Sequence, residues 1–301
     1  MKNQSTSKKA TYIGFGAILL WAMLAVLVSL LGEIPPFQML AMSFYIAFFI
    51  GLIAAFFSQV NLIEIAKMPL KVWALGVSGL FGYHFLLFSA FKNAPVLQVN
   101  LINYLWPLLI VLFSSFLPKT LGGGGLKYWH IIGALFGFGG MVLIISSGDV
   151  SLLQNSNWFG LILAWAAAIV WASYSVLCRL VAHISSHAIT LFCLVTAIAS
   201  TFMHLYFEQT IFPQDLIEWL AIFALGVGPV GGAFYLWDYG MKHGDIAILG
   251  ASAYLTPLLS TFMLVLFNIS QPDFRLWIAT IFITFGAVFA AKDVIFMVNK
   301  K

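Results

Sequence analysis

Amide, imidazole and aromatic side chains recur inside long apolar stretches of this chain. Asn100, Asn103 and Pro107 follow one another at the spacing of a single helix face within the segment 95–117. Polar groups are costly in hydrocarbon unless they find a partner or water, so we expect these side chains to point into a helix bundle. A cavity walled by aromatic rings with a few amides and hydroxyls suits a flat, amphipathic solute, on which the rings stack.

Eleven residues of this kind are candidates for lining a solute-binding cavity. They are Trp21, Tyr83, His84, Asn100, Asn103, Tyr104, Trp106, Trp171, Tyr174, Trp237 and Tyr254.

Several of these residues also have a structural explanation. Asn100 and Asn103 could form hydrogen bonds between neighbouring helices instead of binding a solute. His84 is either a site of proton binding or a side chain whose hydrogen bonds are satisfied within the protein. Asp238 and Lys242 stand four residues apart near the end of an apolar segment, so we expect an ion pair between them at the protein surface. Trp129, Trp158, Trp219 and Trp277 lie near the starts of apolar segments, where tryptophan usually marks the membrane interface.

Catalytic and metal-binding motifs are missing from the sequence. It contains neither HExxH nor GxSxG, and no pair of acidic residues in the middle of an apolar segment, so an enzyme is not expected. Cys178 and Cys193 lie in apolar runs without metal-ligand spacing and are expected to be reduced structural thiols. No metal and no cofactor is expected.

The composition is that of an integral membrane protein. Of the 301 residues, 62% are hydrophobic and only 8% are charged, whereas soluble domains contain about 25% charged residues. The mean hydropathy is +1.02. The net charge of +4 arises from cations spread over short connections and the ends of the chain, so nucleic acid is not an expected partner.

A helix needs about 20 apolar residues to cross the hydrocarbon layer. The sequence predicts ten such helices, and hence an all-α membrane protein. The segments are 10–31, 36–57, 69–91, 95–117, 128–147, 157–180, 187–207, 215–239, 245–267 and 274–297.

A short motif occurs twice, 150 positions apart. The residues at 103–109 read NYLWPLL and those at 253–259 read AYLTPLL, so five of seven positions are identical. The same register aligns Trp21 with Trp171 and Lys92 with Lys242. This internal repeat predicts two five-helix units, 10–147 and 157–297.

Each copy of the motif places a proline inside an apolar segment. Pro107 and Pro257 remove a backbone hydrogen bond and crowd the preceding turn, so each predicts a kink. Paired interruptions in two halves indicate a transporter's solute site, where the kinks would serve gating.

Basic residues favour the cytoplasmic side of a membrane. With the N-terminus inside, twelve of the fourteen Lys and Arg residues fall on the inner side, and only Lys92 and Arg275 fall outside. Because each unit holds an odd number of helices, the second enters the membrane from the opposite side. We therefore expect an inverted 5+5 repeat with both termini in the cytoplasm.

Ten helices in this arrangement, with Trp21, the NYLWP motif at 103–107 and YLTP at 254–257, resemble the EamA-type exporters of the drug/metabolite transporter superfamily. The resemblance covers the whole chain. It implies a bacterial inner-membrane exporter of aromatic and other bulky neutral amino acids, with a central cavity lined by the first, third, fourth, sixth, eighth and ninth helices.

The leading hypothesis is thus a monomeric carrier in the lipid bilayer that works by alternating access. Rings would stack on the solute, and Asn100 and Asn103 would bind its amino or carboxyl group. No carboxylate lies near the centre of a predicted helix, which favours movement of the solute down its own gradient. The alternatives are export of other metabolites or drugs, coupling to protons through His84, and a purely structural membrane subunit.

Overall fold

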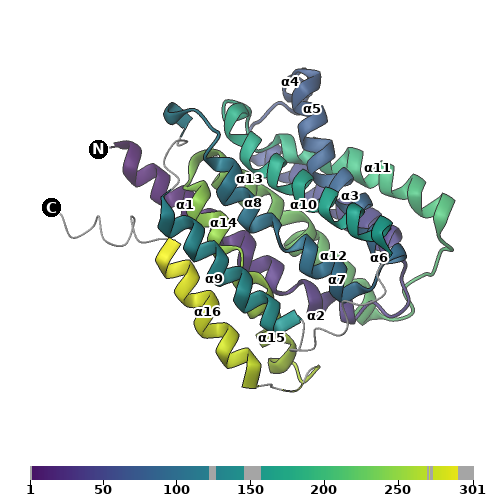
Figure 1. Ribbon diagram of the computed structural model, residues 1–301. Coiled ribbons are helices and arrows are strands. Elements are labelled where there is room, and N and C mark those ends of the chain that lie inside the picture. Colours follow the sequence, from purple (N-terminus) through teal and green to yellow (C-terminus); the bar gives the residue numbers. More distant parts are fainter. Residues whose placement is uncertain (1, 122–126, 146–156, 270, 272–273, 291–301) are drawn as a thin grey trace.

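The structure is a computed structural model that describes residues 2–121, 127–145, 157–269, 271 and 274–290 (Figure 1). All regular elements within these ranges are helices, and none of the described residues lies in a strand. The helices pack side by side in a bundle, as Figure 1 shows. The expected all-α class is therefore confirmed for this part of the chain.

The first half of the chain contains the helices α1 to α9. Their bounds are α1 Lys2–Ala22, α2 Leu24–Ser29, α3 Pro36–Phe57, α4 Leu62–Ala66, α5 Leu70–Val77, η1 Ser78–Gly82, α6 Tyr83–Asn93, α7 Val96–Asn103, α8 Trp106–Ser114, η2 Lys119–Leu121 and α9 Tyr128–Ile145.

The second half repeats most of this order. Its helices are α10 Trp158–Leu177, η4 Cys178–Val181, α11 Ala188–Phe207, α12 Leu216–Val227, η5 Gly228–Gly232, α13 Ala233–His243, α14 Ile246–Ser252, α15 Leu255–Leu266 and α16 Phe274–Ala290.

Seven helices of the described ranges are long and apolar enough to cross a membrane. They are Ser7–Ser29, Pro36–Phe57, Leu70–Asn93, Trp158–Val181, Ala188–Phe207, Leu216–His243 and Ile246–Leu266. Each coincides with an expected segment, so the chain is a multi-pass membrane protein. The expected segment 95–117 contains a shorter apolar helix, Gln98–Ser114. The expected segments 128–147 and 274–297 contain α9 and α16, and their last residues, 146–147 and 291–297, lie outside the described residues.

Large apolar side chains cover the outside of the bundle. Phe56, Phe116 and Trp158 are 79%, 84% and 77% exposed. An apolar exterior of this kind suits lipid, where the helices satisfy their own backbone hydrogen bonds. The exposure of Trp158 agrees with its expected place at the membrane interface, away from the candidate site.

The repeated motif interrupts a helix at both of its positions. A turn at Tyr104-Leu105 separates α7 from α8, and a turn at Ala253-Tyr254 separates α14 from α15. Pro107 and Pro257 follow in the first turn of the next helix, where the missing N–H breaks no helical hydrogen bond. The gating role of these prolines stays a prediction.

Two π-helices occur at equivalent places in the two halves. η1 begins at Ser78 and η5 at Gly228, 150 positions later, and both last five residues. Each continues into an eleven-residue α-helix, α6 or α13. A π-helix contains more residues per turn than an α-helix and often marks a functional site.

Helices from the two halves pack against one another. α1 packs mainly against α13 and α15, whereas α10 packs mainly against α6, α7 and α8. α3 lies along α11, and α9 lies along α16 at one edge of the bundle (Figure 1). The interior is consequently built by side chains from both halves.

Candidate functional site

Four tryptophans from four helices meet inside the bundle. Trp21 comes from α1, Trp106 from α8, Trp171 from α10 and Trp237 from α13. In all six pairs the ring centroids lie between 5.1 and 6.4 Å apart. We call these four residues the tryptophan centre. Most of its ring pairs meet edge to face, a favourable arrangement for aromatic quadrupoles.

Three further candidate residues border the tryptophan centre. The rings of Tyr83 and Tyr174 lie 5.3 and 5.4 Å from Trp171, and the imidazole of His84 lies 5.0 Å from Tyr83. Tyr174 packs against a glycine of η1, Gly79, at which any Cβ would come within 2.3 Å of the tyrosine ring. The structure thus brings seven of the eleven candidates together around one point.

Hydrogen bonds hold two of the indoles in place. Trp21 donates from Nε1 to the Pro229 carbonyl of η5 at 3.0 Å, and Trp237 donates from Nε1 to Ser175 Oγ at 3.0 Å. A buried indole N–H needs such an acceptor. Since one acceptor belongs to a π-helix, the unusual backbone of η5 helps to position the tryptophan centre.

Asn103 lies at the end of α7 and is buried. Its Nδ2 donates to the Tyr83 hydroxyl at 3.2 Å, a hydrogen bond between neighbouring helices. Its Oδ1 is buried without a hydrogen-bond partner among the described residues. A buried acceptor of this kind is costly unless something binds it, so Asn103 also retains the capacity to accept from a solute.

His84 hydrogen-bonds within its own helix turn. Its Nδ1 lies 2.6 Å from the Leu80 carbonyl. A carbonyl can only accept, so Nδ1 carries a hydrogen in this contact. The ring also packs against Phe44 and Phe234, at 5.8 and 6.0 Å.

The remaining candidates lie elsewhere. Tyr254 is fully buried in a second apolar cluster with Val111 and Ala134, and Tyr104 packs against the same cluster. Asn100 is half-buried on α7, and its backbone carbonyl accepts from the Tyr104 amide at 2.9 Å.

Phe234 also borders the tryptophan centre, although the sequence did not single it out. Its ring lies 5.6 Å from Trp171 and 6.3 Å from Trp21. The chain has 29 phenylalanines, and nothing in residue type distinguishes this one. A signal was nevertheless present, because Phe234 stands 150 positions after His84 and so occupies its place in the repeat.

Asp238 and Lys242 do form an ion pair, at 2.8 Å, but the expectation of a surface pair was wrong. Their side chains are only 2% and 3% exposed. The four-residue spacing correctly indicated that the two side chains pair. Their burial, however, depends on the turn before α11, which covers the ion pair. Ser186 of that turn donates to Asp238 Oδ2 at 2.5 Å.

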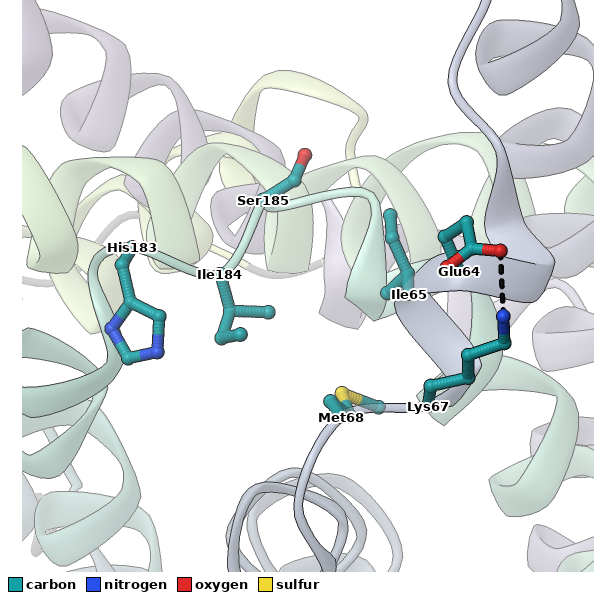
Figure 2. A pocket seen from close by; sticks show the side chains of 7 residues that line it. All are labelled: Glu64, Ile65, Lys67, Met68, His183, Ile184 and Ser185. Atoms are coloured by element: carbon teal, nitrogen blue, oxygen red, sulfur yellow. Dashed lines mark hydrogen bonds and ion pairs between the residues drawn. The ribbon is translucent and has the colours of Figure 1, made fainter.

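A separate pocket of about 390 Å³ opens beside this turn. Figure 2 shows His183, Ile184 and Ser185 on one wall and the exposed Glu64–Lys67 ion pair on the other. Glu64 lies in α4, so this pocket is not part of the tryptophan centre.

Within the described part of the chain, no group of three or more His, Cys, Asp or Glu side chains is placed to hold a metal ion. Cys178 and Cys193 are buried free thiols.

Comparison with known proteins assigns the family. Residues 8–146 and 158–291 each match the EamA-like transporter family. The aromatic amino acid exporter YddG of Ancylobacter novellus is 44% identical over 282 residues, covering 93% of this chain and 96% of that protein. YddG of Salmonella typhimurium is 27% identical, covering 94% of this chain and 97% of its own.

A solved crystal structure is similar along nearly its whole length. It is 43% identical in sequence, has a TM-score of 0.88, and covers 95% of this chain and 98% of its own. The resemblance to EamA-type exporters expected from the sequence is confirmed. Together with the multi-pass helical fold, these matches show that the chain belongs to the EamA-like transporter family.

Proposed function

We propose that this protein exports aromatic and other bulky neutral amino acids across the bacterial inner membrane, and that the tryptophan centre binds them. The relatives named as aromatic amino acid exporters support the solute class. The observation that carries the proposal is the meeting of four indoles from four helices, two from each half of the chain.

The solute would enter between rings that contact one another in this structure. Indole and phenol faces stack on an aromatic side chain and attract a cation such as the solute's ammonium group. Asn103 Oδ1, which is buried without a partner among the described residues, would accept from that ammonium. Asn100, Tyr104 and Tyr254 would act at the edge of the pathway.

Alternating access would use the repeat. We propose ten membrane helices in two inverted five-helix units, with both termini in the cytoplasm. The two family matches and the two π-helices at one spacing support this organisation. Because inverted units can exchange conformations, each state of one unit has a counterpart in the other.

The helix breaks before Pro107 and Pro257 would act as hinges of this exchange. A break leaves backbone groups without their usual partners and lets the two helix parts tilt separately. The carrier would act as a monomer in the bilayer, without metal, cofactor or enzymatic step.

Solute counterflow in proteoliposomes tests the proposal. Vesicles loaded with unlabelled phenylalanine should accumulate labelled phenylalanine and tryptophan, and glutamate and lysine should compete weakly. Trp171→Ala should lower the initial rate by about tenfold or more, since a buried aromatic contact contributes ~1.5 kcal/mol or more. Trp158→Ala, which changes an exposed tryptophan, should transport at the wild-type rate.

The same vesicles distinguish the alternatives. Failure to exchange any neutral amino acid, together with exchange of another metabolite, would favour the broader family activity. An imposed pH gradient should not drive accumulation if the carrier is facilitative. Accumulation that depends on the gradient and is lost in His84→Gln would instead indicate proton coupling.

A further inference from the structure

The buried ion pair is attached to the turn that precedes α11. Lys242 Nζ donates to the Ile184 carbonyl at 3.0 Å, and Ser186 donates to Asp238 Oδ2 at 2.5 Å. Nearby, Arg179 donates to the Gly244 carbonyl. Burying two charges costs several kcal/mol unless each finds further hydrogen bonds, so the turn supplies the partners that make this burial tolerable.

These contacts join two different sets of helices. Asp238 and Lys242 lie on α13, which packs mainly against α1. The turn follows α10, which packs mainly against α6, α7 and α8. Movement of one set against the other would therefore break these hydrogen bonds, whereas movement of both sets together would preserve them.

The turn also separates the Asp238–Lys242 ion pair from the open pocket. His183, Ile184 and Ser185 form a wall of the open pocket in Figure 2, and the carbonyl of Ile184 binds Lys242 on the other side. Cys178 is buried at the start of η4, a short helix that packs against α13. Displacing the turn that contains His183, Ile184 and Ser185 would open a path from the pocket to Asp238 and Cys178.

The other copy of the repeat lacks this arrangement. Lys92 takes the place of Lys242 and Phe88 takes the place of Asp238, 150 positions earlier. Lys92 is exposed, and its Nζ lies over the rings of Phe37 and Phe207 at 5.8 and 5.6 Å. The Lys242 end of the second half thus has a buried ionic network, whereas the equivalent Lys92 end of the first half has the cation–π contacts of an exposed lysine.

We infer that Asp238, Lys242 and Ser186 form a latch that closes the pathway on the Lys242 side and must open in every transport cycle. The distribution of basic residues predicts that this side is cytoplasmic. The inference rests on the proposed alternating access, but the latch can be observed without any solute.

Cys178 is a natural reporter for the latch. In a Cys193→Ser background, a bulky hydrophilic maleimide should react slowly with Cys178, because the thiol is buried. Ser186→Ala removes one hydrogen bond to a charged group and should raise the labelling rate about tenfold. Asp238→Asn should raise it at least as much. Lys92→Gln, at the equivalent position of the other half, should leave the rate unchanged.

Labelling of Cys193 in a Cys178→Ser background identifies general unfolding, since Cys193 is fully buried in α11. A rise at Cys178 alone supports the latch. Unchanged labelling in both Ser186→Ala and Asp238→Asn, or an equal rise at both thiols, would overturn it. If labelling rises as expected while counterflow shows no amino-acid exchange, the latch stands and the proposed solute is wrong.

Discussion

The tryptophan centre depends on small residues that leave room for large ones. Trp237 is fully buried because Ser175 on α10 provides both a short side chain and a hydroxyl acceptor for its indole. Tyr174, the preceding residue, fits only because Gly79 of η1 has no side chain. Aromatic side chains of the site are therefore positioned by neighbours that would not themselves contact a solute.

Gly79→Ala tests this dependence on space. The new Cβ would lie 2.3 Å from the ring of Tyr174, so the ring or the helix must shift. Overpacking of this kind costs about 1–3 kcal/mol. Gly82→Ala is the matched control in the same π-helix, because its nearest neighbour is 3.7 Å away. Thermal unfolding in detergent should show a lower midpoint for Gly79→Ala than for Gly82→Ala.

Asn103→Leu tests the proposed ammonium contact. The change keeps the size of the side chain but removes the acceptor, so KM for phenylalanine should rise about tenfold, the value of a hydrogen bond to a charged group. Inhibition by 3-phenylpropionate, which lacks the amino group, should be unaffected. Asn93→Leu, at the end of α6, should behave as wild type. An equal loss of affinity for both compounds would argue against this role.

Which kinds of residue lie inside the bundle was more predictable than which of them contact one another. Amides and tryptophans inside apolar segments are costly, which is why Trp21, Asn103 and Trp171 could be selected from residue type alone. Their mutual contacts depend on which helices pack together, and no local pattern reports that. For the same reason the spacing of Asp238 and Lys242 predicted a pair, whereas its burial had to come from the structure.

At the level of elements, the helix breaks are the features on which the proposed gating depends. Pro107 and Pro257 follow turns at equivalent places, and both lie in the first turn of a helix. The sequence predicted a kink at each proline because proline lacks an N–H, whereas each break lies just before the proline, which then occupies the first turn of the next helix. It did not predict the short helix α4, because five residues carry too little periodicity to be recognised.

Pro107→Ala and Pro257→Ala should slow transport. Alanine restores a backbone donor and favours a continuous helix, so each hinge should stiffen. We expect a roughly tenfold lower counterflow rate, corresponding to ~1.4 kcal/mol in the barrier. Equilibrium binding of labelled phenylalanine should change little. Pro69→Ala, at the N-terminal end of α5, serves as the control, and wild-type rates in both hinge variants would contradict the hinge assignment.

For the whole molecule, the internal repeat is the sequence feature that best predicted which positions of the two halves correspond. A shared register of 150 positions aligns Trp21 with Trp171 and Lys92 with Lys242 from residue identity alone. The helices that follow the two π-helices begin at the same spacing. The packing of α1 on α13 and of α10 on α6 was not predictable from the repeat, because in each pair a helix of one half packs against a helix of the other half.

Side-specific labelling tests the inverted arrangement. Ser58 and Gln209 are both exposed and follow α3 and α11, which occupy equivalent places in the two halves. In a background without Cys178 and Cys193, Ser58→Cys should react with an impermeant maleimide only from the cytoplasmic side. Gln209→Cys should react only from the periplasmic side. Reaction of both from one side would rule out inversion.

The wide turn of η5 also sets the directions in which the side chains of α13 point. If these five residues were wound as an ordinary α-helix instead, everything that follows in α13 would be rotated by roughly 100°, about the angle of one residue. Trp237 would then leave its indole neighbours, and Asp238 would no longer face Ser186. Charge and hydropathy would hardly differ, yet transport should be lost. The directions in which the side chains of this helix point are thus set by the winding of one wide turn.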